Sequence, residues 1–104
     1  MFFLMQCHHH DDKDADRDTH RAAHREWVGS GGHGIASVLT GSAMWNDSGE
    51  GIGNFGILET KTKAEALAFA QGDPFNKHGI VREIVLTRLA DGFQEARIER
   101  MSSK

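Results

Sequence analysis

The sequence predicts an α+β fold with the element order β-α-β-β-α-β and an antiparallel sheet. Three observations predict it. Four apolar or β-branched runs are spread along the chain, segments with helix signals follow the first and the third of them, and a turn cluster joins the middle two. This order is the ferredoxin-like, or split β-α-β, arrangement. The 104 residues suffice for one small domain, expected to span 1–104 with a C-terminal extension at 90–104.

The first half of the chain supplies a strand, a helix and a hairpin. The run FFLMQC, from Phe2 to Cys7, is a short apolar stretch that suits a buried strand. From Asp11 to about Ser30 the chain is polar, and the Gly-rich stretch GSGGHG predicts the end of a helix there. Residues 35–45 and 52–60 are rich in β-forming side chains and flank the turn cluster NDSGEG, which predicts a hairpin.

The second half begins with the most clearly signalled helix. Thr62 and Glu65 form a capping box, and Gly72 ends the helix. The apolar spacing predicts a buried face made of Ala64, Leu67, Ala68 and Gln71, with Phe69 beside it. An Asp before a Pro, at 73–74, then predicts a short helical turn. Residues 80–89 predict the last main strand, and residues 92–101 can add an edge strand.

A sheet of this type carries helices on one face only, so its other face needs a cover. A second copy of the same sheet is a common cover, and a chain this short gains from association. We therefore expect a homodimer that buries well over about 1,000 Å².

Composition narrows the class of partner. The formal charge is −3, from 12 Lys and Arg against 15 Asp and Glu, which gives no reason to expect nucleic acid or an anionic membrane. The single cysteine, Cys7, excludes an internal disulfide and fits a reducing compartment. No run approaches the roughly 20 apolar residues of a membrane span, and the apolar start MFFLM is too short for a leader. We expect a cytoplasmic protein without nucleic-acid or membrane partners.

A stripe of basic residues follows the first predicted helix. At 100° per residue, Arg17, Arg21, His24 and Val28 fall within about 60° of one another. The residues beside this stripe, Ala23 and Trp27, are its expected core contacts. Guanidinium groups near a buried face are costly unless a cavity, a carboxylate or an anionic ligand receives them. The stripe therefore indicates either an anion-binding site or a solvated helix edge that pairs with the nearby aspartates.

Five of the seven histidines lie between residues 8 and 24. Strand alternation places His8 and His10 on one side and His9 on the other, and we expect His8 and His10 to line the site. A metal is the alternative, because His20 and His24 are four residues apart and His8 or His10 could add a ligand. The sequence has no Cys pair and no His-Glu-x-x-His motif, so we expect no bound metal or other cofactor.

Three segments resemble the YCII family over nearly the whole chain up to Leu89. They are RDTHRAAHREWV, the hairpin GEGIGNFGILET, and KAEALAFAQGDPFNKHGIVREIVL. The most specific parts are Arg-x-x-x-Arg-x-x-His, carried by Arg17, Arg21 and His24, and Asp-Pro-aromatic, carried at 73–75.

The resemblance implies a dimeric α+β barrel with a catalytic pair formed by His24 and Asp73. Among the activities of the family, the chain looks most like the dehydrochlorinases of chlorinated-phenol breakdown. These are cofactor-independent lyases that remove HCl from a chlorinated hydroxyhydroquinone to give a hydroxyquinone. Arg17 and Arg21 would then bind the oxyanions of the small aromatic substrate, with Phe75 beside it. His24, oriented by Asp73, would accept a proton.

Other functions fit the same residues. A non-catalytic module that binds a small anionic aromatic ligand needs the same arginines. An isomerase acting on a lactone from ring cleavage would use the same pair for proton abstraction. A metal-binding protein would use the histidines instead.

Overall fold

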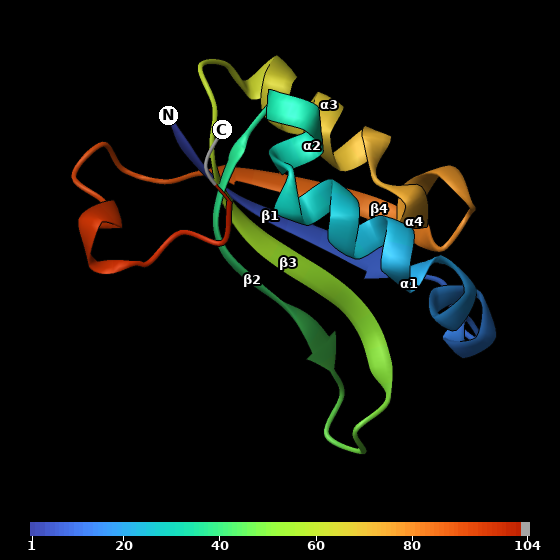
Figure 1. Ribbon diagram of the computed structural model, residues 1–104. Coiled ribbons are helices and arrows are strands. Elements are labelled where there is room, and N and C mark those ends of the chain that lie inside the picture. Colours follow the sequence, from blue (N-terminus) through green and yellow to red (C-terminus); the bar gives the residue numbers. More distant parts are fainter. Residues whose placement is uncertain (103–104) are drawn as a thin grey trace.

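Four antiparallel strands form one sheet in the order β2-β3-β1-β4, which confirms the predicted ferredoxin-like arrangement (Figure 1). The structure is a computed structural model that describes residues 1–102. The strands are β1 (Phe2–His9), β2 (Ser37–Trp45), β3 (Gly51–Glu59) and β4 (Val81–Arg88). The helical elements are α1 (Asp14–Gly29), α2 (Gly31–Gly34), α3 (Lys63–Gly72), α4 (Pro74–Lys77) and the 3₁₀ turn η1 (Glu95–Arg97).

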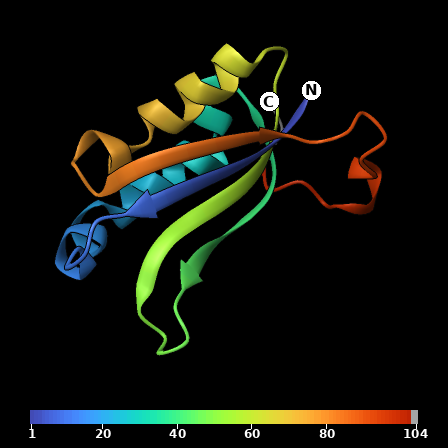
Figure 2. The same cartoon turned by 180° about the vertical axis from the view of Figure 1, so that it is seen from behind.

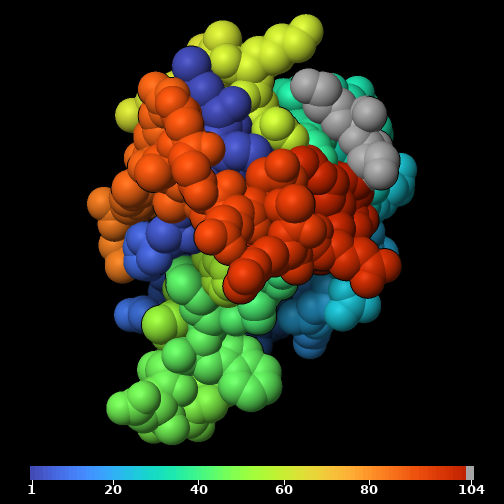
Figure 3. Space-filling view, turned by 90° about the vertical axis from the view of Figure 1, so that its left-hand side faces the viewer, coloured from blue at the N-terminus to red at the C-terminus, as the bar shows by residue number. Residues whose placement is uncertain are grey.

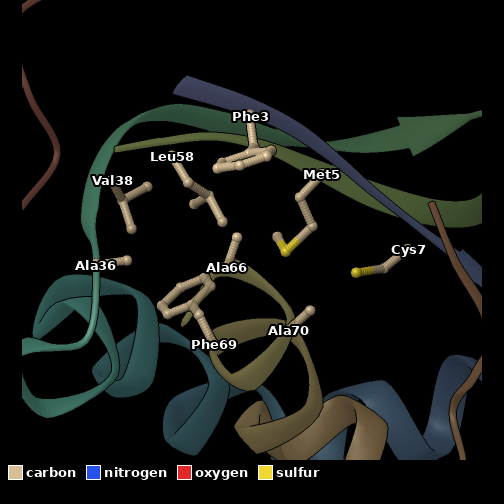
Figure 4. Packing of buried hydrophobic residues seen from close by; sticks show 9 residues of the cluster. All are labelled: Phe3, Met5, Cys7, Ala36, Val38, Leu58, Ala66, Phe69 and Ala70. Atoms are coloured by element: carbon tan, nitrogen blue, oxygen red, sulfur yellow. The ribbon is translucent and has the colours of Figure 1, made fainter. Parts of the chain in front are cut away.

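Strand β1 shows how the sheet separates its two faces. Its burial alternates strictly, so Phe3, Met5, Cys7 and His9 point into the layer between sheet and helices. Figure 4 shows this layer, with side chains from the sheet packed against α3. The cluster consists of Phe3, Met5, Cys7, Ala36, Val38, Leu58, Ala66, Phe69 and Ala70. The helices therefore cover the face of the sheet that carries the odd-numbered residues of β1.

The buried face of α3 differs from the predicted one. Ala66, Phe69 and Ala70 are buried, whereas Leu67 is 39% exposed. The prediction was wrong because the alanines of this helix leave its apolar spacing ambiguous. The cap is also slightly different from a standard capping box. Thr62 accepts from the Glu65 N–H at 3.2 Å as predicted, but the Glu65 carboxylate accepts from the N–H of Lys61.

The end of α1 is locked onto α3 by Trp27. Its indole N–H donates to the Phe69 carbonyl at 3.0 Å. A Cβ at Gly72 would lie 2.5 Å from the indole, and one at Gly32 would lie 2.8 Å from it. Gly32 also has φ +64°, within the left-handed turn α2 that the sequence predicted only as a helix stop. Glycine at these two positions lets the helix approach closely enough to form one wall of a pocket.

Among residues 1–102, no helix covers the other face of the sheet (Figure 2). By the strand register, Leu4 pairs with Ile57, and Phe55 and Val85 flank Gln6 on this face. The four apolar side chains are half-buried. The β2–β3 hairpin projects beyond the helices, and Trp45 near its tip is 68% exposed. This is the surface that the expected homodimer would cover.

The C-terminal segment does not form the expected edge strand. Residues 92–101 make the turn η1 and then return to the outer edge of β2, where they bond to the backbone only at Val38 and Leu39. None of the helices in residues 1–102 combines the length and the apolar character that crossing a bilayer requires.

Candidate active site

A pocket of about 450 Å³ lies between α1 and the β2–β3 half of the sheet. The helix contributes the basic stripe, whose side chains line this cavity. The sheet contributes the floor, and α3, α4 and the C-terminal segment each contribute one side chain. The side chains that line the pocket include Met5, His9, Arg17, Arg21, His24, Arg25, Val28, Val38, Phe69, Phe75 and Met101.

The floor of the pocket is partly bare backbone. Gly41 and Gly56 pair across β2 and β3, and both line the pocket. A Cβ at Gly41 would lie only 2.6 Å from the Phe55 carbonyl oxygen, so a side chain there requires the strands to separate. A flat, side-chain-free floor leaves room for a planar ring between the sheet and α1.

His24 and Asp73 form the contact at the back of the pocket. The His24 Nδ1 lies 2.8 Å from both carboxylate oxygens of Asp73. One of these oxygens also accepts from the Phe75 N–H at 2.8 Å, so Asp73 caps α4 and holds His24 at the same time. The Asp73 side chain is 5% exposed, which keeps this ion-pairing contact out of water. Asp73 therefore serves both as the cap of α4 and as the partner of His24.

The arrangement determines which nitrogen of His24 can react. A carboxylate can only accept, so Nδ1 carries a proton and donates it to Asp73. Within residues 1–102 no hydrogen bond engages Nε2, and the side chain lines the pocket, so in the neutral imidazole Nε2 is the nitrogen that carries the lone pair. The Phe75 ring is stacked on the imidazole, with centroids 4.1 Å apart and planes at 1°. His24 is thus an oriented imidazole with one nitrogen available as a proton acceptor.

Arg17 is the buried cation of the stripe, and groups of the protein itself balance its charge and accept its hydrogen bonds. Its guanidinium pairs with Asp14, donates to the Gly51 carbonyl at 3.3 Å, and donates to His9 Nδ1 at 3.1 Å. His9 Nε2 in turn lies 2.8 Å from Asn54 Oδ1. This network ties α1 to β1 and β3, and it leaves Arg17 fewer free donors for a ligand than the sequence alone indicated.

The network fixes His9 as a neutral imidazole. Because a guanidinium only donates, Nδ1 must accept, and Nε2–H then donates to Asn54. Burial is the main cause that lowers the pKa of His9 below its ordinary value of 6.5, and the nearby charge of Arg17 acts in the same direction. The neighbouring Cys7 is inert for a similar reason, since burial raises the pKa of its thiol to about 12.

Arg21 and Arg25 are the more available cations. Arg21 pairs with Asp18 at the helix surface, and its side chain is 41% exposed. Arg25 lies one turn further along, is exposed, and takes part in no ion pair within the described chain. Two guanidinium groups at the pocket mouth can bind oxyanions of a ligand whose ring lies inside.

Two of the predicted residues lie elsewhere. His8 is on the opposite face of the sheet, and His10 is exposed beyond the end of β1, so neither lines the pocket. The expected direction of the alternation was wrong, because His9, not His8 or His10, is the residue of this triplet that lines the pocket. His20 stacks on His78 with ring centroids 3.7 Å apart. In the part of the chain that the structure describes, no three His, Cys, Asp or Glu side chains are gathered to hold a metal.

Sequence reasoning missed His9, Asn54, Arg25 and Met101. A signal for His9 existed, because Gln6 is the only polar residue inside the run FFLMQC. If Gln6 faces away from the core, the odd-numbered residues face inward and His9 with them. Arg25 follows His24 directly and was outside the stripe. Nothing in the sequence indicated that Met101, near the end of the chain, reaches the pocket.

Comparisons with known proteins agree on the fold. The family model of the YCII-related domain matches residues 1–90. Among solved structures, one match is the 5-chloro-2-hydroxyhydroquinone dehydrochlorinase of Burkholderia phenoliruptrix AC1100, in complex with 2,5-dihydroxybenzoquinone. The TM-score is 0.75 at 23% sequence identity, over 88% of this chain and 96% of that chain. No curated protein matches the chain.

Proposed function

The chain belongs to the family of YCII-related domains, and from that premise we propose that it is a cofactor-independent lyase. Its proposed reaction is the elimination of HCl from a chlorinated hydroxyhydroquinone, which yields a hydroxyquinone in aromatic degradation. The observation that carries this proposal is the oriented His24, which lines the pocket with Nδ1 held by Asp73 and with no partner for Nε2 within residues 1–102. The similarity in fold to a dehydrochlorinase supports the choice of substrate class.

The proposed step begins from the keto tautomer of the substrate, in which chlorine is bonded to an sp³ carbon. Nε2 of His24 takes the proton of a ring hydroxyl, and the O–H electron pair becomes a new carbonyl π bond. Electrons shift through the ring, the C–Cl bond breaks, and chloride leaves with its electron pair. The products are the hydroxyquinone, chloride and a proton on His24. The step needs no oxidant.

The charges of the site suit this step. Asp73 stabilises the imidazolium that forms when His24 takes the proton, without having to be protonated itself. Arg21 and Arg25 are placed to bind the oxyanions that the substrate presents at the mouth of the pocket. The bare floor at Gly41 and Gly56 suits the flat ring.

The direct test is chloride release from a chlorinated hydroxyhydroquinone under anaerobic conditions after treatment with a chelator. The proposal expects chloride and hydroxyquinone in equal amounts. Release that requires added metal or flavin contradicts it. Tight binding without release would favour the non-catalytic module, and turnover of a lactone instead would favour the isomerase.

We further propose that the active form is a homodimer joined through the helix-free face of the sheet. This face carries Leu4, Phe55, Ile57 and Val85, and none of them is fully covered within one protomer. Contiguous apolar surface of this kind is typical of a protein interface.

A further inference from the structure

We propose that residues 98–102 form a wall of the pocket, and that Met101 limits the size of the ligand group that fits at this end. The segment lies beyond the family domain, which ends at residue 90. The selectivity of this pocket would then depend on a part of the chain that the family match does not include. The proposal rests on the proposed function only in assuming that the ligand is a flat ring.

The segment is seated on the outer edge of β2. That strand lies at the end of the sheet order, so its outer backbone groups have no strand partner. The Met101 N–H donates to the Val38 carbonyl at 2.9 Å, and the Ser102 N–H reaches the same carbonyl at 3.0 Å. The Ser102 hydroxyl accepts from the Val38 N–H at 2.8 Å. These bonds form where a bulge between Val38 and Thr40 interrupts the pairing of β2 with β3.

Arg100 fixes the segment from the other side. Its guanidinium donates to the Ser37 hydroxyl at 2.6 Å and pairs with Glu59 at 2.8 Å, so it spans the ends of β2 and β3. It also pairs with Glu95 of η1 at 3.1 Å, which closes the returning loop. Ser102 is 4% exposed. The segment is therefore a packed part of the fold rather than a trailing end.

Held in this way, the Met101 side chain reaches the pocket. It lines the cavity together with Val38, although 52% of the residue remains exposed. In the space-filling view the C-terminal segment lies across the side of the molecule above the β2–β3 hairpin (Figure 3). A thioether is flexible and polarizable, and it adapts to an apolar or halogen substituent. Met101 is therefore placed to contact a ring substituent that reaches this end of the pocket.

The first test compares two ring ligands by equilibrium binding. These are 2,5-dihydroxybenzoquinone and its bulkier 3,6-dichloro derivative. Replacing Met101 with alanine is expected to shift the affinity ratio toward the larger ligand by about tenfold. Met101→Trp is expected to shift it the other way. Leu67→Ala, which truncates an exposed apolar side chain outside the pocket, is the matched control. An unchanged ratio in both Met101 variants overturns the proposal.

The second test needs no ligand. A Val28→Cys variant places a thiol in the pocket wall, and the native Cys7 stays silent because it is buried and its pKa is about 12. Adding Met101→Ala is expected to increase the rate of labelling with a bulky maleimide by a larger factor than the rate of labelling with iodoacetamide, because the larger reagent is the one that the Met101 side chain obstructs. If the labelling rates by both reagents rise by the same factor, residues 98–102 do not form a wall of the pocket. If neither quinone binds any variant but the labelling ratio changes, the proposed function fails while the wall stands.

Discussion

His24 and Phe75 lie ring on ring, with their centroids 4.1 Å apart and their planes at 1°. The stack covers one face of the imidazole, while Asp73 holds its Nδ1. An imidazole restrained in both ways loses little freedom when it takes a proton, and this pre-organisation is typical of a general base. The first two predictions follow from this pair of restraints.

Replacing His24 with alanine is expected to lower kcat on the order of 10²- to 10⁴-fold while substrate affinity changes little, because the arginines still bind the oxyanions. Single-turnover kinetics and equilibrium binding measure the two effects separately. His20→Ala is the control, since it removes a histidine from the same helix that does not line the pocket. Equal loss of activity in both variants would show that the helix, not His24, had been damaged.

Asp73→Asn is expected to keep the cap of α4 and lose the activity. The asparagine oxygen can accept from the Phe75 N–H, as the carboxylate does. Its NH₂ group then faces His24 Nδ1, which must become the acceptor, so the proton moves to Nε2 and the base is lost. Thermal unfolding should be close to wild type, while kcat falls by about 10²-fold or more. Full activity in a stable variant would show that Asp73 is only a cap.

Arg21→Ala is expected to raise KM and lower kcat together, because the charge that it meets is present in the substrate and grows in the transition state. The free energy of unfolding of Arg21→Ala should be lower than that of wild type by less than about 1 kcal/mol, since the pair with Asp18 is solvent-exposed. Arg17→Ala provides the contrast. It leaves His9 Nδ1 and the Gly51 carbonyl without their donor, so urea unfolding should show a loss of about 1–3 kcal/mol. Similar stabilities for the two variants would argue against the buried network.

Acid is expected to destabilise the protein through His9. Its pKa in the folded protein is lower than the 6.5 of the unfolded chain, so below about pH 6.5 the unfolded chain binds a proton that the folded chain does not. This contribution is fully present above that pH and is lost as the pH falls toward the folded pKa. Urea unfolding at about pH 7.5 and 5.5 should show a smaller pH effect in His9→Gln than in wild type. His10→Gln, at an exposed position, should keep the wild-type dependence.

The protein is expected to sediment as a dimer at micromolar concentration. Leu4→Glu puts a charge into the helix-free face of the sheet and should yield monomers without unfolding the protomer, because Leu4 is outside the core cluster. Leu67→Glu on the exposed side of α3 should leave the dimer intact. A monomeric wild-type protein would contradict the expected assembly.

The sequence predicted the order of elements well because turn clusters, caps and the polar first helix are local signals. The stripe of Arg17, Arg21 and His24 was also visible, since helical spacing alone places these residues on one side. It was harder to predict which of two similar faces of a helix or strand is buried. Alanines surround the true buried face of α3, and His8 and His10 were favoured over His9 because the preceding run is almost wholly apolar.

Long-range contacts could not be read from spacing. His9, Arg17 and Asn54 meet only because β1 pairs with β3 in the sheet and the guanidinium from α1 reaches both strands. The C-terminal segment looked like a strand because residues 92–101 contain β-forming side chains. In the fold its backbone bonds to β2 are restricted to Val38 and Leu39, and Arg100 donates to the Ser37 hydroxyl.

Under the proposed function, in which the product is a quinone, the buried Cys7 has a consequence. Quinones are electrophiles that add to thiolates, and a nucleophilic cysteine near the pocket would be arylated by the product over successive turnovers. Cys7 is the only thiol of the chain, it is 2% exposed, and its pKa of about 12 keeps it protonated. A catalyst built in this way has no thiolate with which to inactivate itself, and its working lifetime would be set by the stability of its fold.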